Sequence, residues 1–202
     1  MRNRSHNYII AFLTICLVLG GGLLAGSVVI ESPPTLLAEH PQNQALPVAH
    51  SSETESSSWH LQIPTIKLNA PVQKVGLTST GAMGVPSNYN DVGWLEIGPE
   101  PGQVGTAVIA GHLNSGPNKP AAFTQLASIN PGDYIYIDNK DINDKLQFKV
   151  TDIKSYDVNT APLEKIFGNS DTPHLNLITC DGKWDASKKD YTKRLVVFSK
   201  MI

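Results

Sequence analysis

The sequence predicts a mainly β domain, either a barrel or a sandwich, that follows a membrane-spanning helix and a flexible tether. Two observations indicate the β class. Short apolar runs rich in β-branched residues recur from Trp59 to the C-terminus, and clusters of turn-forming residues such as "GPEPGQVG" and "NPGD" separate them. A βαβ fold would place helices of about 10 to 15 residues between such runs. The spacing therefore favours a barrel or a sandwich.

The N-terminal 30 residues contain the expected membrane anchor. Residues 8–30 carry no charged side chain and exceed the roughly 20 apolar residues that a bilayer-spanning helix needs, whereas a signal-peptide core has about 7 to 15. Arg2 and Arg4 precede this run and Glu31 follows it. Residues 1–7 are therefore expected in the cytoplasm, and the rest of this single-pass protein outside the cell membrane. Cleavage near "LLAEH" is an alternative that would leave the domain on the same side.

The segment after the anchor, residues 31–58, is expected to be a disordered extracellular tether. It is rich in Pro, Ser, Gln, His and Glu and ends in "HSSETESSS". Such a composition buries too little apolar surface to offset the entropy lost on ordering. The folded domain is therefore expected to span residues 59–202.

Within that domain, seven apolar runs are the expected strands and two segments are the expected short helices. The strand runs are "HLQIPTIKL", "APVQKV", "TAVIAG", "DYIYID", "KLQFKVTDI", "LNLIT" and "RLVVF". "KPAAFTQLASI" has Pro120 at a plausible first helical position, with Phe123 and Leu126 three residues apart. "APLEKIFG" ends in Gly168, a residue suited to a helix C-terminus.

The overall charge argues against a nucleic-acid partner. The chain has 16 Lys and Arg against 18 Asp and Glu, and no basic stripe occurs outside the N-terminus. The sequence shows no internal repeat, no Gly-rich phosphate loop and no metal-ligand spacing. No cofactor and no metal ion are therefore expected.

Cys180 and Arg194 are the first candidates for chemistry. Cys16 belongs to the apolar anchor, which leaves Cys180 as the cysteine of the folded domain. If "LNLIT" and "RLVVF" form an antiparallel hairpin, Cys180 at the end of one strand lies beside Arg194 at the start of the next. A guanidinium there favours a thiolate and can donate hydrogen bonds to an oxyanion. The alternatives are an inert buried cysteine and an arginine that is only a solvated charge.

A nucleophilic cysteine also needs a proton carrier, and two histidines of the domain are candidates. His174 precedes Cys180 by six residues on the same strand, about 20 Å away at 3.3 Å per residue, which excludes direct proton exchange. His112 instead follows the run "TAVIA" through Gly111, at a strand end where the absent side chain leaves room for an approaching group. His112 is therefore the expected partner of Cys180.

These residues resemble the signatures of the sortases, the membrane-anchored cysteine transpeptidases of Gram-positive bacteria. The similar segments are "IPTIKLNAPV", "AGHLNSGPNKPAAFTQLASINPGD", "LNLITCDGKWD" and "RLVVF". The resemblance implies an eight-stranded sortase-type β-barrel, with His112 as the catalytic histidine, Cys180 as the nucleophile and Arg194 as the oxyanion-stabilising arginine. The contexts "AGH", "TC" and "RLVVF" look closest to the small class F or class D/E types. Asp181 departs from the glycine that often follows the cysteine there.

The resemblance further implies a reaction and its partners. Cys180 would attack the Thr–Gly amide of an LPxTG-like sorting signal on an exported protein, and His112 would protonate the leaving amine. A cell-wall precursor amine would then resolve the acyl-enzyme. Two alternatives remain at this stage. One is an anchored β-domain that binds wall or peptide without catalysis, and the other is a hydrolytic cysteine peptidase, although papain-like chains place the cysteine before the histidine.

Overall fold

The computed structural model describes residues 59–139 and 144–202, and the expected N-terminal anchor and tether lie outside this part of the chain. The described residues contain eight strands and three short helices. The strands are β1 Trp59–Ile63, β2 Leu68–Val75, β3 Val92–Leu95, β4 Gly105–Gly111, β5 Tyr134–Asn139, β6 Asp144–Asp157, β7 Pro173–Asp185 and β8 Asp190–Met201. The helices are η1 Pro64–Ile66, η2 Leu126–Ser128 and α1 Leu163–Phe167. None of these helices is long and apolar enough to cross a membrane.

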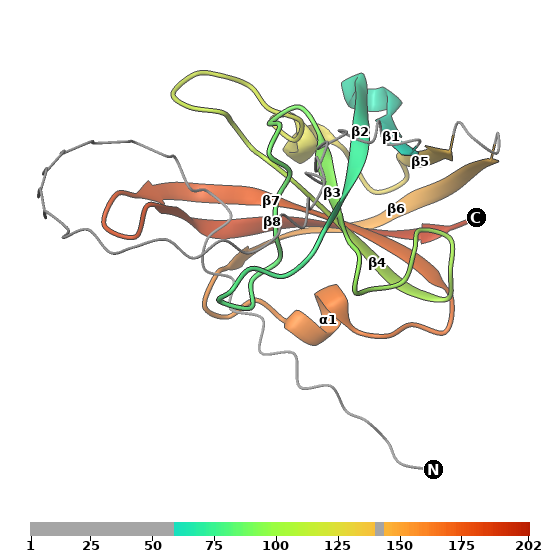
Figure 1. Cartoon of the computed structure of the whole chain (residues 1–202). Coiled ribbons are helices and arrows are strands. Elements are labelled where there is room, and N and C mark those ends of the chain that lie inside the picture. The colour runs from blue at the N-terminus through green and yellow to red at the C-terminus, as the bar shows by residue number, and fades with distance from the viewer. Residues whose placement is uncertain (1–58, 140–143) are drawn as a thin grey trace, which may run out of the picture. The chain divides into compact units, whose positions relative to one another are not determined.

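The strands close into a barrel, which decides between the two β architectures that the sequence allowed. The order around the barrel is β1-β2-β3-β4-β7-β8-β6-β5. Neighbouring strands run antiparallel except for the β2–β3 and β4–β7 pairs. Strands β7 and β8 form the long hairpin that crosses Figure 1. The expectation of an eight-stranded β-barrel is confirmed for the described residues.

Alternation along the strands divides the buried side chains between two faces. One set fills the barrel interior and includes Ile109, Leu177 and Val197. The residues one position along, such as Val108, Ile178 and Val196, belong to a second cluster with α1. This explains why all seven residues of β4 are buried. The β4–β7–β8 wall is therefore covered on its outer face as well as its inner one.

Helix α1 closes the outer cluster. Its Ile166 is fully buried there, and the side-chain amide of Asn176 on β7 donates to the Ile166 carbonyl at 2.8 Å. Gly168 is the C-cap as expected, but its φ of −70° is open to any residue. The glycine is required for another reason, because a Cβ there would lie 2.1 Å from the Glu164 carbonyl oxygen. Gly168 thus permits a close approach rather than a left-handed turn.

Two local expectations were wrong. "VGWL" forms β3, which was absent from the seven runs because four buried residues show no alternation. Of "KPAAFTQLASI", only Leu126–Ser128 forms a helix, a single 3-10 turn. Phe123 and Leu126 are nevertheless both fully buried in the barrel core, so their spacing indicated packing and not helix length.

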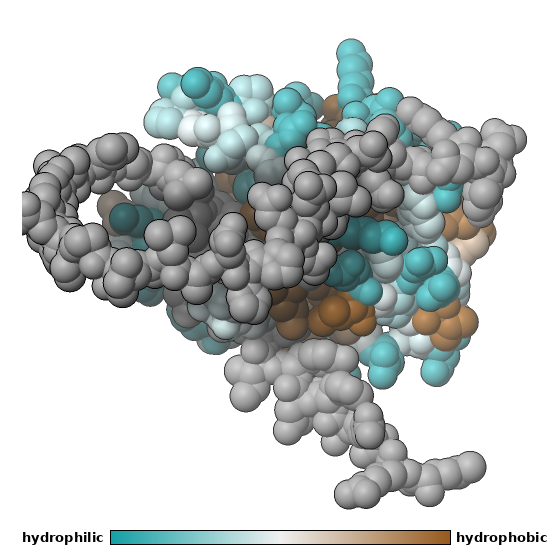
Figure 2. Space-filling model, in the orientation of Figure 1, coloured by the Kyte–Doolittle hydropathy of each residue, from teal (hydrophilic) through white to brown (hydrophobic). Residues whose placement is uncertain are grey.

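The exposed surface in Figure 2 is mixed, with hydrophilic residues interrupted by separate hydrophobic patches.

Candidate active site

The strand register brings the three candidate residues together. Cys180 on β7 pairs directly with Arg194 on β8, as the hairpin argument predicted. On the other side of β7, the parallel ladder with β4 pairs Ala110 with Ile178, and His112 and Cys180 each lie two residues beyond that pair. Cys180 and Arg194 therefore lie on the neighbouring strands β7 and β8, and His112 directly follows β4 on the other side of β7, although its number is 68 lower than that of Cys180.

The side chains of Cys180 and Arg194 belong to the outer face of this wall, and His112 directly follows its strand β4. The residues two positions before His112 and Cys180, and two after Arg194, are members of the outer cluster beneath α1. Side chains two apart on a strand share a face, so the candidate residues extend that cluster toward one end of the barrel. Thr179, one residue before Cys180 on β7, has the opposite orientation and is 1% exposed on the barrel side.

The hairpin differs from the expected one in length. Cys180 is the eighth residue of β7 and Arg194 the fifth of β8, so neither lies at a strand end. Beyond the pair, the ladder continues with a register shift after Asp181 and ends at Asp185. Gly182 serves this irregularity, because its φ is +80° and a Cβ there would lie 2.7 Å from the Thr192 hydroxyl. The candidate site therefore lies within the ladder, with a polar extension beyond it.

Gly111 has the role that its position suggested. An added Cβ would lie 2.5 Å from the Phe123 ring, so the absent side chain makes room for that residue. The Phe123 amide also donates to the His112 carbonyl at 2.9 Å. The chain after His112 thus folds back onto the end of β4 and fixes the backbone from which the histidine projects.

His112 is held by two groups from the segment between β2 and β3. Its Nε2 lies 3.0 Å from the Pro86 carbonyl oxygen, and the Tyr89 ring packs on the imidazole with a centroid separation of 4.6 Å. A carbonyl only accepts hydrogen bonds, so Nε2 must carry a hydrogen in this arrangement. Nδ1 is then the nitrogen that can gain or lose a proton. Sequence reasoning did not identify Pro86 and Tyr89, because irregular segments carry no periodic signal.

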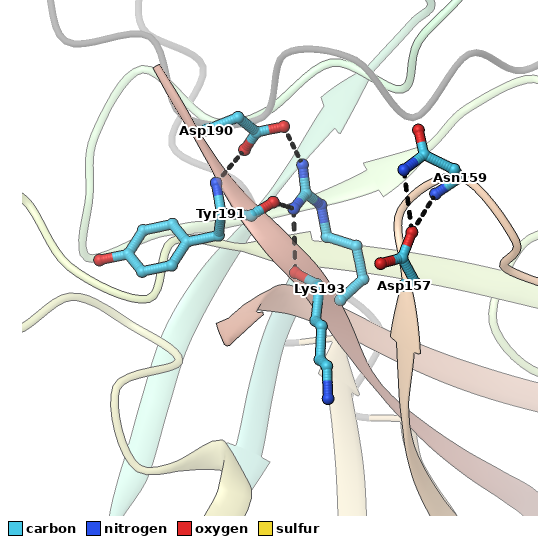
Figure 3. A network of polar contacts seen from close by, with 6 residues as sticks. Asp157, Asn159, Asp190, Tyr191 and Lys193 are labelled. Atoms are coloured by element: carbon cyan, nitrogen blue, oxygen red, sulfur yellow. Dashed lines mark hydrogen bonds and ion pairs between the residues drawn. The ribbon is translucent and has the colours of Figure 1, made fainter. Parts of the chain in front are cut away.

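Arg194 is fully buried, so the solvated-charge interpretation is wrong. Its Nη1 donates to the carbonyl oxygens of Tyr191 and Lys193, both at 3.0 Å. Its Nη2 donates to Asp190 Oδ2 at 2.6 Å, and the Asp190 side chain is only 9% exposed. The other Asp190 oxygen accepts the Tyr191 amide at 2.7 Å (Figure 3). The guanidinium therefore lies back along β8 toward the start of the strand.

Asp190 is a residue that the sequence analysis missed. A signal was present, because residues four apart on a strand share a face and Asp190 precedes Arg194 by four.

Cys180 on β7 is buried, with 1% of its surface exposed. His174 lies six residues before it on β7, where its Nδ1 is 2.8 Å from the Ser170 hydroxyl and 2.9 Å from the Thr172 carbonyl. The structure thus separates His174 from the candidate site, as expected.

A pocket of about 220 Å³ lies beside Asp190. Asp157, Asn159 and Tyr191 are among its lining residues. The backbone amide of Asn159 is the main reason why the pKa of Asp157 is lowered, and the Asn159 side chain adds to this effect (Figure 3). The pKa of Asp185 is also lowered, chiefly by the Ser187 hydroxyl and amide. Among the described residues, no group of three or more His, Cys, Asp or Glu side chains could hold a metal ion.

Comparison with known proteins identifies the family. The family model for the sortase domain matches residues 61–202. No curated protein matches the chain in sequence. Similar solved structures include sortase C1 of Streptococcus agalactiae in complex with MTSET, which is 26% identical with a TM-score of 0.56 and covers 74% of this chain and 69% of that one.

Two further solved structures show the same fold. Sortase A of Listeria monocytogenes is 21% identical with a TM-score of 0.56, and the match covers 73% of this chain and 88% of that one. Sortase C-1 of Actinomyces oris is 19% identical with a TM-score of 0.58, and the match covers 76% of each chain. Because the family model spans most of the chain, the protein belongs to the sortase family and is a cysteine transpeptidase.

Proposed function

We propose that this sortase cleaves an LPxTG-like sorting signal through an acyl-enzyme on Cys180 and transfers the exported protein to a cell-wall precursor amine. The observation that carries the proposal is the register of the β4–β7–β8 wall. It pairs Cys180 with Arg194 and ends the adjacent strand β4 just before His112. A nucleophile, a proton carrier and an oxyanion donor are the three groups that acyl transfer needs.

In the first half-reaction, the Cys180 thiolate attacks the carbonyl carbon of the threonine in the Thr–Gly amide. The carbonyl electrons move onto oxygen, and the Arg194 guanidinium donates to the oxyanion that forms. Collapse of this intermediate breaks the C–N bond, and His112 gives its proton to the leaving amine. The products are a thioester on Cys180 and a peptide that begins with glycine.

In the second half-reaction, an acceptor amine attacks the thioester and His112 takes up the amine proton. The thiolate leaves, and a new amide joins the acceptor to the sorted protein. The bond between His112 Nε2 and the Pro86 carbonyl supports Nδ1 as the atom that moves the proton in both steps. Water can replace the amine, in which case the same thioester is hydrolysed.

The membrane location and the subclass are part of the same proposal. Residues 8–30 would anchor the enzyme, so that its extracellular domain meets exported proteins and wall precursors at the membrane face. The compact domain and the contexts of the three candidate residues support a small class F or class D/E type. Asp181 is the departure from those types.

Mass spectrometry of the acyl-enzyme tests the reaction. The full chain, solubilised in detergent with a reducing agent, is incubated with a library of sorting-signal peptides, and the modified cysteine is located by peptide mapping. We expect an adduct on Cys180 and not on Cys16, with the mass of the peptide up to threonine. Addition of triglycine should convert this adduct to a transfer product. Cys180→Ala should give neither species, and an adduct that persists in this variant would contradict the proposal.

A further inference from the structure

The ion pair between Asp190 and Arg194 differs from the other ion pairs in the described part of the chain. Lys154 lies 3.6 Å and Lys165 lies 3.7 Å from the Asp152 carboxylate, and both lysine side chains are more than half exposed. Asp190 and Arg194 meet at 2.6 Å with side-chain exposures of 9% and 0%. Removal of two charges from water is costly, and a buried pair of this kind is weak evidence for a stabilising role.

The contacts of the pair fix an orientation. Both Asp190 oxygens are engaged, Oδ1 by the Tyr191 amide and Oδ2 by the guanidinium, so the carboxylate cannot rotate without losing a bond. On the arginine, Nη1 is directed at two backbone carbonyls of the same strand. A planar guanidinium held at both terminal nitrogens has a defined plane. Asp190 contributes a side-chain contact to this set of bonds.

We propose that Asp190 is a positioning residue that sets the plane of the Arg194 guanidinium for stabilisation of the oxyanion. This inference rests on the proposed function. The oxyanion exists only after attack on the carbonyl, so a misdirected guanidinium weakens the transition state more than the bound substrate. Loss of the Asp190 carboxylate therefore lowers kcat and leaves KM nearly unchanged. A role limited to neutralising a buried charge would change the melting temperature without this kinetic pattern.

The test compares two neutral isosteric variants of the full chain in detergent under reducing conditions. Asp190→Asn removes the carboxylate that contacts Arg194. Asp157→Asn removes the same charge from another wall of the same pocket, where the carboxylate accepts hydrogen bonds from the backbone and side-chain amides of Asn159. We expect kcat for peptide transfer to fall at least tenfold in Asp190→Asn, with KM within twofold of wild type. Asp157→Asn should stay within twofold in both, and equal kcat values for the two variants would overturn the proposal.

The same substitution, made in a variant that already lacks the Arg194 side chain, separates positioning from other effects. If Asp190 acts through Arg194, Asp190→Asn should change the single-turnover rate of acylation less than twofold when Arg194 is already alanine. An unchanged tenfold loss in that background would overturn the inference. If melting curves show that Asp190→Asn is unfolded at the assay temperature, Asp190→Glu takes its place. Its displaced carboxylate should lower kcat at least threefold, and wild-type kcat would contradict the proposal.

The outcomes also distinguish this inference from the proposed function. A wild-type chain that forms no acyl-enzyme on Cys180 contradicts the proposed function itself. A wild-type chain that forms the adduct, together with an Asp190→Asn variant that matches Asp157→Asn, contradicts only the positioning role.

Discussion

His112 directly follows one neighbour of the Cys180 strand and Arg194 lies on the other, yet the protein holds them in different ways. His112 contacts a neutral backbone carbonyl and an aromatic ring, both from the segment between β2 and β3. Arg194 contacts a buried carboxylate and two carbonyls of its own strand. The histidine is therefore oriented by neutral groups, whereas the arginine is oriented in part by a charged carboxylate.

The proposed chemistry accounts for this difference. A proton carrier must both gain and lose a proton, and a carboxylate beside an imidazole would favour the charged form and oppose its release. A backbone carbonyl orients the ring without placing a charge beside it. Arginine remains protonated at all relevant pH values, so a carboxylate can fix its direction without any effect on a proton-transfer step. The two kinds of contact thus match one group that transfers a proton in the proposed reaction and one that does not.

The largest expected effect on the transfer rate comes from loss of His112, the residue held by neutral groups. His112→Ala should lower the rate of transfer by roughly 10²- to 10⁴-fold, because the leaving amine loses its acid. His174→Ala is the matched control, since that histidine also contacts a backbone carbonyl and is partly buried on β7. We expect the control to stay within twofold of wild type in the same peptide-transfer assay. Similar losses in both variants would show that a buried histidine matters here only for folding.

A change at Arg194, the residue held by the Asp190 carboxylate, should give the next largest effect on the transfer rate. Arg194→Lys keeps the charge but loses the planar fork, and one oxyanion donor contributes roughly 3 kcal/mol, or about a hundredfold in kcat. Because the guanidinium also makes three hydrogen bonds to the protein, the melting temperature should fall by a few degrees. The rate is therefore measured well below the melting midpoint. The reciprocal exchange at the neighbouring exposed residue, Lys193→Arg, should change neither quantity, and wild-type kcat in Arg194→Lys would remove the guanidinium from the reaction.

The pairing of Cys180 with Arg194 could be predicted from the sequence, whereas the way each residue is held could not. Two apolar runs joined by a loop indicate a hairpin, and hairpin geometry opposes the end of one run to the start of the next. The strands themselves continue through "DGKWD" and "DYTKR", whose residues are mostly polar or exposed and pair with each other. Hydrophobic pattern reports burial and not pairing, so it ends β7 too early and begins β8 too late.

The supports of the two side chains show the same limit. Asp190 could have been identified, because its spacing from Arg194 places both on one strand face. Pro86 acts through its carbonyl oxygen, which every residue possesses, and Tyr89 lies outside any strand or helix. Gly111 was singled out correctly as a place of close approach, but only the structure identifies Phe123 as the group that approaches. Contacts made by backbone atoms and irregular segments leave no mark on residue type.

A hydrogen bond between the segment that follows His112 and the hairpin that carries Arg194 should have a smaller effect on the transfer rate. The Asn114 amide, two residues after His112, donates to the Tyr191 hydroxyl at 2.5 Å and so joins the chain that follows β4 to the hairpin of Arg194. Tyr191→Phe removes this bond and keeps the ring that packs on Trp184. A bond of about 1 kcal/mol corresponds to roughly a fivefold fall in transfer rate if it holds the two sides in register. The exposed Tyr134→Phe on β5 is the control, and equal rates for both variants would mean that the sides are positioned independently.

The smallest expected effect concerns charge that lies near the site but takes no part in it. The pKa of Asp157 is lowered from 3.8 in the folded protein, mainly by the Asn159 amide. A lowered pKa means that the ionised form contributes stability above the unfolded value, and that this contribution is lost as pH falls through the folded pKa. Asp157→Asn should therefore melt slightly below wild type at neutral pH, with a difference that shrinks as the pH falls below about 4. Thermal melts from pH 7 to pH 3 measure it, and a difference that does not change with pH would mean that the ionised carboxylate is not its source.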